Sequence, residues 1–192
     1  MFSAVEGMVK MLLYALSSTA IVVLLMVTAA LVWGGPGTPP PIESINDPFN
    51  SVDFSHMPAL KNYQGADGAK LFYREYAPIG ANIKGSAVLV HGSSGSSESL
   101  HPMATVLAAA GLQVYALDVR GHGKSGPKGH IAFIGQLESD LQLFVQAVQP
   151  PSPSTLIGFS SGGGFALRVA ASEMQSAFDH YLLLSPWGAY SL

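Results

Sequence analysis

The chain has 192 residues, enough for one domain of ordinary size, and its 12 acidic residues slightly outnumber its 9 basic ones. No basic block occurs, so the sequence offers no basis for nucleic-acid binding. Cysteine is absent, which excludes disulfides, thiolate catalysis and cysteine-ligated zinc.

An uncharged run of 23 residues, 11–33, lies near the N-terminus. As a helix it would reach about 34 Å, enough to cross a hydrocarbon core of about 30 Å. Lys10 flanks the run, and the next basic residue after it is Lys61. The positive-inside bias therefore predicts a transmembrane anchor with residues 1–10 in the cytoplasm and the remaining chain exported. The alternative is a signal peptide cleaved near Thr28-Ala29-Ala30, with secretion of the domain, although the hydrophobic regions of signal peptides are usually shorter.

Residues 34–60 begin with a stretch rich in proline and glycine, which predicts a linker. Residues 61–192 have the pattern of an α/β domain. Apolar or alternating runs predict strands within 70–78, 86–92, 112–119, 154–159 and 180–186. Helices are predicted within 101–111, 131–148 and 163–174, and in the second of these Phe133, Leu137, Leu141 and Phe144 share one face. This alternation predicts a mostly parallel sheet with crossover helices.

The run "YLLLS", residues 181–185, is apolar at consecutive positions, as in a central strand of a parallel sheet. As a terminal strand it would present an apolar unpaired edge, which proteins normally avoid. We therefore expect the sequence to continue beyond Leu192.

The segment "LIGFSSGGGF" places Ser160 between Gly158 and Gly162 in the spacing G-x-S-x-G, after a predicted strand and before a predicted helix. This is the pattern of a nucleophile elbow, in which a sharp turn exposes the serine hydroxyl and the flanking positions must be small. Helix N–H groups next to the serine favour developing negative charge. Ser160 is therefore the candidate nucleophile, against the alternative of a glycine-rich helix start that serves packing only.

The loop "HGSSGSS", residues 91–97, follows a buried strand, which is where the second donor of an oxyanion hole lies in enzymes with such an elbow. We predict that the backbone N–H groups of Ser93 and Ser161 form the hole. The alternative is a flexible Ser/Gly loop.

The segment "DVRGHGKSG", residues 118–126, contains the spacing G-x-G-x-x-G after a strand. A dinucleotide site requires this pattern in the first strand–helix unit, with a helix starting at once, and neither condition is met. A phosphate-binding P-loop would need glycine where Asp118 stands. We therefore do not expect a nucleotide site here.

Together, "LVHGSSGSS", "YALDVRGHGKSG", "LIGFSSGGG" and "YLLLSP" resemble the α/β-hydrolase superfamily, and more narrowly its monoacylglycerol lipase and serine aminopeptidase-like (lysophospholipase) branch. The resemblance covers residues 61–192 and implies the first six strands of that fold. It also implies that the turn from Arg120 to Ser125 is structural and lies near the site, so that His122 has a structural role.

In that family the triad acid and histidine follow the seventh and eighth strands. The resemblance therefore implies that both lie outside this chain, as does the lid that shapes the acyl pocket. The chain's six histidines are each expected in loop or capping roles, namely His56, His91, His101, His122, His130 and His180. Asp118 and Asp140 precede the nucleophile and are expected to serve structure.

The resulting prediction is a membrane-anchored serine hydrolase of carboxylic esters such as acylglycerols or lysophospholipids, with an incomplete triad in this chain. It needs no metal or organic cofactor, and its partners are a small-molecule or lipid ester and, through residues 11–33, a membrane. The alternatives are a serine aminopeptidase-like peptidase and a non-catalytic membrane-tethered module. The sequence indicates no particular oligomeric state.

Overall fold

The computed structural model describes residues 2–34, 52–80 and 82–185. The chain divides into two units, residues 1–51 and 52–192, and each is described by itself. Most of the predicted linker 34–60 falls on residues 35–51, which lie outside the described residues.

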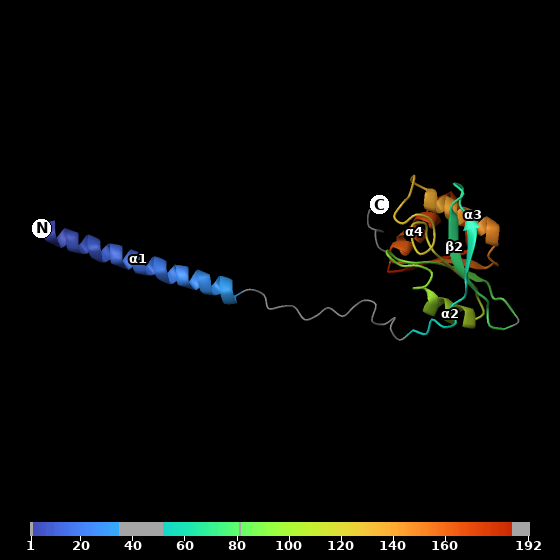
Figure 1. The fold of residues 1–192 in the computed structure, drawn as a ribbon, viewed down its shortest axis with the longest axis horizontal. Coiled ribbons are helices and arrows are strands. Elements are labelled where there is room, and N and C mark those ends of the chain that lie inside the picture. The colour runs from blue at the N-terminus through green and yellow to red at the C-terminus, as the bar shows by residue number, and fades with distance from the viewer. Residues whose placement is uncertain (1, 35–51, 81, 186–192) are drawn as a thin grey trace. The chain divides into compact units, whose positions relative to one another are not determined.

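The first unit contains one helix, α1 (Phe2–Trp33), drawn in blue in Figure 1. Its stretch Val5–Trp33 is long and apolar enough to cross a membrane, with a mean hydropathy of 2.4. The helix begins before the uncharged run and includes Glu6 and Lys10, which lie one turn apart and form an ion pair at 3.1 Å. A helix of this composition near the N-terminus fits either a membrane span or a signal sequence.

The second unit is built on a six-stranded sheet with the order β1-β2-β4-β3-β5-β6. The strands are β1 (Leu60–Gln64), β2 (Lys70–Tyr76), β3 (Ser86–Val90), β4 (Gln113–Leu117), β5 (Ser154–Phe159) and β6 (His180–Leu184). The pairs β4–β3, β3–β5 and β5–β6 are parallel, whereas β1–β2 and β2–β4 are antiparallel. The predicted mostly parallel sheet is therefore confirmed.

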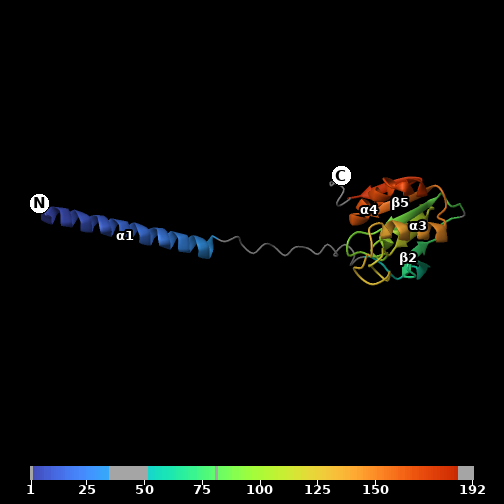
Figure 2. The same cartoon turned by 90° about the horizontal axis from the view of Figure 1, so that it is seen from above.

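Helices cover both faces of this sheet, as Figures 1 and 2 show. Helix α2 (His101–Ala109) packs its small residues Ala104 and Ala108 against one face. Helices α3 (Gln136–Val148) and α4 (Ser161–Ala170) cover the other face, where Phe144 is fully buried. A 3-10 helix, η2 (Glu173–Ala177), leads into β6. Alternate residues of each strand point to opposite faces, so the sheet has one apolar core on each side.

Strand β1 was not among the predicted strands. It pairs with β2 alone and lies at an edge of the sheet, and only Leu60 and Tyr63 are half-buried. A short strand with so few buried positions has no apolar run or clear alternation, so no sequence signal marked it.

Helix α3 begins at Gln136, so the prediction of a helix from residue 131 was wrong for its first five residues. Gly135, at φ 94°, adopts a left-handed conformation that stops a helix from running through it. The buried Gln136 side chain then accepts the N–H of Ala132 at 2.7 Å and holds the preceding residues in a turn. Phe133 therefore lies outside the helix and is 55% exposed, whereas Leu141 and Phe144 are buried as predicted.

Strand β6 is the last strand in the order and pairs in parallel with β5. Among the described residues nothing pairs with its outer edge, and Leu182 on it is 46% exposed. This is the apolar edge that the sequence predicts for "YLLLS" as a terminal strand.

Candidate active site

Ser160 is the single residue between the end of β5 and the start of α4. Its backbone has φ 53° and ψ −117°, a conformation that residues with a side chain rarely adopt. Such strain persists only where the surrounding structure enforces it, and it is concentrated at functional sites. The predicted sharp turn between strand and helix is therefore present, at the carboxyl edge of the parallel strands.

The two glycines of the G-x-S-x-G pattern are required by close backbone contacts. A Cβ atom on Gly158 would lie 2.0 Å from the carbonyl oxygen of Gly162. A Cβ atom on Gly162 would lie 2.5 Å from the carbonyl oxygens of both Val90 and His91, where β3 ends. The small residues thus let helix α4 start directly against β5 and the end of β3.

The loop after β3 passes next to the serine. A Cβ atom on Gly92 would lie 3.1 Å from the Cβ of Ser160, and 3.4 Å from the ring of Phe159. Ser93 is the next residue in this loop, and Ser161 is the first residue of α4, where a backbone N–H has no acceptor within the helix. Of the two predicted donors, Ser161 therefore directly follows Ser160, and Ser93 directly follows Gly92, which lies next to Ser160.

His91 fixes the course of this loop, and both of its ring nitrogens form hydrogen bonds with the backbone. Its Nε2 accepts the Val119 N–H at 3.1 Å, so Nδ1 carries the proton and donates to the Gly92 carbonyl at 2.7 Å. Burial of the ring holds the pKa of His91 below its ordinary value. A neutral ring with both nitrogens occupied acts as a positioning group for Gly92 and cannot accept a proton from Ser160.

Asp118 organises the glycine-rich turn that follows β4. Its buried carboxylate accepts the N–H of Ser97 at 2.7 Å and that of Lys124 at 2.9 Å, and its carbonyl accepts the Ser125 hydroxyl at 2.6 Å. Gly123 leaves the space for the carboxylate, because a Cβ atom there would lie 2.2 Å from Asp118 Oδ2. These contacts join the turn to the 91–97 loop, and they agree with the structural role predicted for Asp118 and for the turn from Arg120 to Ser125.

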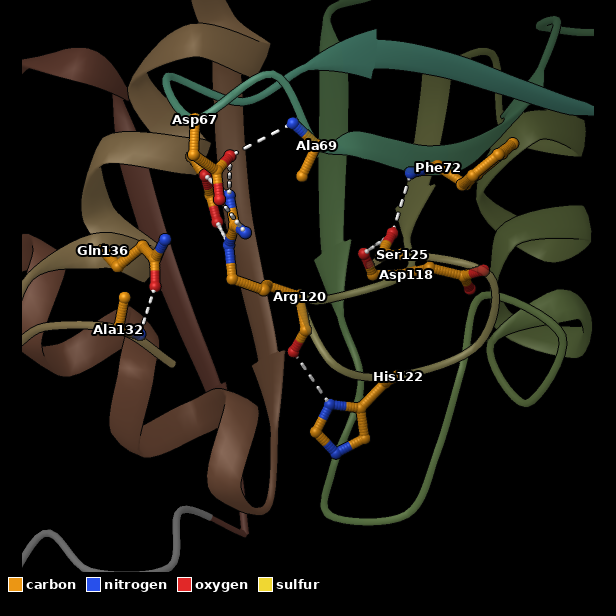
Figure 3. A network of polar contacts seen from close by, with 10 residues as sticks. Asp67, Ala69, Phe72, Asp118, Arg120, His122, Ser125, Ala132 and Gln136 are labelled. Atoms are coloured by element: carbon orange, nitrogen blue, oxygen red, sulfur yellow. Dashed lines mark hydrogen bonds and ion pairs between the residues drawn. The ribbon is translucent and has the colours of Figure 1, made fainter. Parts of the chain in front are cut away.

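Arg120 is buried and contacts two carboxylates, one of which, Asp67, is labelled beside it in Figure 3. Its guanidinium donates to Asp140 on α3 at 2.6 and 2.8 Å, and to Asp67 in the β1–β2 turn at 2.8 and 3.0 Å. The paired carboxylates raise the pKa of Arg120 further, and Arg120 lowers the pKa of Asp67. Asp140 thus serves structure, as predicted, whereas no sequence signal indicated Asp67, which lies 53 residues from its partner.

The remaining histidines lie in several environments. His122 hydrogen-bonds through Nδ1 to the Arg120 carbonyl at 3.2 Å (Figure 3), and its ring centroid lies 5.1 Å from that of His91. His101, at the start of α2, is buried between the Tyr76 hydroxyl and the Asp53 carbonyl. The other three are exposed, namely His56, His130 and His180. Within residues 52–80 and 82–185, no histidine hydrogen-bonds to Ser160.

The described residues hold no group of three or more His, Asp or Glu side chains that could bind a metal ion. The G-x-G-x-x-G stretch is followed by a turn and not by a helix, so it lacks the helix N-terminus that binds a pyrophosphate.

A mostly parallel sheet with a strained serine between strand and helix is the architecture of an α/β hydrolase. The chain belongs to the family described as serine aminopeptidase, S33, which matches residues 81–192. The resemblance drawn from the four motifs is thereby confirmed.

Two relatives carry lipase names. The chain is 33% identical over 114 residues to the monoacylglycerol lipase of Mycolicibacterium smegmatis, a match that covers 57% of this chain and 40% of the relative. It is 32% identical over 140 residues to the human monoglyceride lipase, covering 71% of this chain and 45% of the relative. The matched part thus spans less than half the length of either relative.

Solved structures show the same fold. An esterase from Exiguobacterium antarcticum superposes with a TM-score of 0.56 at 25% identity, covering 66% of this chain and 45% of its own. A soluble variant of the monoglyceride lipase of Saccharomyces cerevisiae, in complex with a substrate analogue, superposes with a TM-score of 0.61 at 23% identity, covering 71% and 47%.

Proposed function

We propose that this chain supplies the nucleophile and the oxyanion hole of a membrane-anchored serine hydrolase that cleaves carboxylic esters of the acylglycerol or lysophospholipid class. The observation that carries the proposal is the backbone strain at Ser160, held in place by glycines at positions 158, 162 and 92. The substrate class follows from the lipase relatives, and the apolar side chain of Phe159, 47% exposed beside Ser160, suits an acyl group.

The proposed reaction is acyl transfer in two steps. The Ser160 hydroxyl attacks the ester carbonyl while a base takes its proton, and the N–H groups of Ser93 and Ser161 stabilise the negative charge on the carbonyl oxygen. The C–O bond to the alcohol then breaks, the alcohol leaves with a proton, and an acyl-serine remains. Water attacks this ester, releases the carboxylic acid and regenerates the serine.

The base and its carboxylate partner are proposed to come from residues outside this sequence. Both ring nitrogens of His91 and His101 are engaged in other hydrogen bonds, and His122 is tied to the Arg120 carbonyl. Without a base, catalysis by the serine falls by orders of magnitude, because the triad members act as a unit. Extending the coding sequence past codon 192 tests this directly. A downstream frame with an Asp and a His in the family's order would support the proposal, and its absence would contradict it.

Labelling with a fluorophosphonate probe tests the nucleophile. A version extended by a downstream frame that supplies the base should be labelled at Ser160, the chain of residues 1–192 should be labelled far more slowly, and Ser160→Ala should abolish the labelling. Ser161→Ala is the matched control, because it removes the neighbouring hydroxyl and keeps the backbone N–H. Ser160-independent labelling, or none in the extended version, would leave the non-catalytic module as the better interpretation.

A peptidase of the same family is the second candidate, because the family description names serine aminopeptidases. Parallel assays of monoacylglycerol esters and of peptides with a free N-terminus distinguish the two. Ester cleavage without peptide cleavage is the result we expect.

The localisation follows from α1. We propose that α1 stays uncleaved and crosses the membrane with residues 1–10 in the cytoplasm and the hydrolase unit on the other side. Its apolar length and the position of Lys10 support this arrangement. Protease digestion of intact and opened cells, with tags at each end, tests the orientation, and N-terminal sequencing of the mature protein distinguishes an anchor from a cleaved signal.

A further inference from the structure

Three large apolar side chains are exposed within four consecutive residues just before α3. Ile131 is 53% exposed, Phe133 55% and Ile134 99%. In residues 52–80 and 82–185, no other four-residue stretch exposes three such side chains. An exposed apolar cluster of this kind on a folded unit indicates a surface that contacts a membrane or another protein surface. We call residues 131–134 the apolar loop; it is part of the yellow segment that runs into α3 in Figure 2.

The exposure is built into the fold. The buried Gln136 side chain accepts the Ala132 N–H at 2.7 Å (Figure 3). The Gln136 N–H donates to the Phe133 carbonyl at 3.3 Å. Gly135 adopts its left-handed conformation directly after the loop. These contacts hold the backbone in a turn that directs the isoleucines and the phenylalanine to the surface. The exposure of these side chains therefore follows from a hydrogen-bonded backbone conformation.

Two lysines precede this loop, and the nearest carboxylate, Glu138, lines the same surface pocket as the loop but is neutralised by an ion pair. Lys124 and Lys128 are exposed a few residues before it, and no Asp or Glu occurs between residues 119 and 137. The first carboxylate beyond the loop, Glu138, is paired with Arg168. Exposed apolar side chains beside lysines are the combination by which protein surfaces enter the interface of an anionic membrane.

We propose that the apolar loop inserts Ile131, Phe133 and Ile134 into the membrane leaflet that faces the hydrolase unit, while Lys124 and Lys128 contact anionic headgroups of that leaflet. If helix α1 stays in the membrane, as proposed above, it keeps the apolar loop close to a lipid surface. The 17 residues 35–51 can extend about 60 Å at most, so the unit remains within reach of the lipid surface. Because the tether holds the apolar loop near the lipid surface, its local concentration there is high, and a weak contact between the loop and the lipid is strengthened.

The position of the loop gives this contact a consequence for the reaction, which rests on the proposed function. The chain segment 118–135 follows β4 as Ser160 follows β5, and both strands run in parallel with β3 between them. The carboxyl ends of parallel strands share one edge of a sheet, so the segment after β4 starts at the edge where Ser160 lies. The Gly129 N–H donates back to the Gly121 carbonyl at 3.4 Å, which keeps the start of the apolar loop near that edge. Docking through this loop would turn that edge toward the lipid in which an acylglycerol dissolves.

The test uses the absence of cysteine from the chain. Ile134→Cys in the chain of residues 1–192 is labelled with an environment-sensitive fluorophore and reconstituted in nanodiscs with either 30% phosphatidylserine or phosphatidylcholine alone. Two quenchers are compared: nitroxide-labelled lipids, which report contact with the bilayer, and aqueous iodide, which reports contact with water. Val106→Cys on α2, 68% exposed and on the opposite face of the sheet, is the matched control.

We expect nitroxide lipid to quench the label at position 134 in anionic nanodiscs and iodide to quench the label at position 106. Lys124→Gln with Lys128→Gln should lower the ratio of lipid-embedded to water-exposed label by about 25-fold, at about fivefold for each lysine. Equal iodide quenching at positions 134 and 106 in both kinds of nanodisc would overturn the proposal. Protection of position 134 from both quenchers would overturn it too, because a protein surface would then cover the loop. Neither readout depends on hydrolase activity.

Discussion

Gly158 and Gly162 approach each other across the turn at Ser160 so closely that a Cβ atom on Gly158 would lie 2.0 Å from the Gly162 carbonyl oxygen. That oxygen belongs to the backbone of α4 and cannot move away as a side chain could. Gly158→Ala should therefore lower the free energy of unfolding by about 3 kcal/mol. Chemical denaturation in detergent, followed by circular dichroism, measures this. Gln146→Ala at an exposed position of α3 is the control, and an equal effect of the two substitutions would refute the steric argument.

Ser160→Gly and Ser160→Ala should separate strain from chemistry. Both remove the hydroxyl and should abolish fluorophosphonate labelling. Glycine adopts φ 53° without the strain of a side chain, which is worth about 1–3 kcal/mol, but it loses about 0.5–1 kcal/mol more backbone entropy on folding. We expect Ser160→Gly to be more stable than Ser160→Ala by about 1 kcal/mol in parallel denaturation curves. The reverse order would show that the turn is not strained.

Ser93→Pro and Ser93→Ala test the oxyanion hole. Proline removes the backbone N–H of residue 93, and the glycine before it tolerates the restriction that proline places on its neighbour. Losing one oxyanion donor should lower the rate of labelling or ester cleavage by about 10²–10³-fold in a version with a complete triad. Ser93→Ala keeps the N–H and should react at nearly the wild-type rate. Equal rates for the two variants would remove Ser93 from the hole.

The two carboxylates of Arg120 should contribute unequally to stability. Asp140 is buried, and Asp140→Ala leaves the guanidinium without its buried partner, at a cost of about 3–5 kcal/mol. The side chain of Asp67 is 47% exposed, so water can solvate Arg120 in Asp67→Ala and the loss should be much smaller. Denaturation of both variants in the same detergent checks the order. A larger loss for Asp67→Ala would contradict it.

His91 should make stability depend on pH just below neutrality. Burial lowers its pKa in the folded protein, so between that pKa and the unfolded value of about 6.5 the unfolded chain binds a proton that the folded chain does not. The stability from the neutral ring is thus present above pH 6.5 and is lost as the pH falls. We expect the free energy of unfolding to drop between pH 7 and pH 5, and His91→Gln to flatten that slope.

His130→Gln serves as the control for this experiment, because His130 is exposed. Its pH slope should match that of the wild type. If His91→Gln keeps the full slope, then His91 is not the titrating group in this pH window.

The sequence by itself determined the local features of this protein. The spacing of Gly158, Ser160 and Gly162 specifies a sharp turn because the constraint lies within five residues. The alternation of apolar runs and helical periods specifies a mostly parallel sheet for the same reason, since each signal is complete within its own segment. Both predictions agree with the structure.

Only the tertiary structure decided which distant groups meet. The sheet order places Gly92 against Ser160, and the pairing of Arg120 with Asp67 joins groups 53 residues apart. Such contacts depend on how strands from separate parts of the chain lie side by side, which local periodicity does not encode. The tertiary structure also decided the conformation of residues 131–134, for which the helical spacing of apolar residues predicted a helix with a buried face. A left-handed Gly135 and the Gln136 hydrogen bond made it an exposed turn instead.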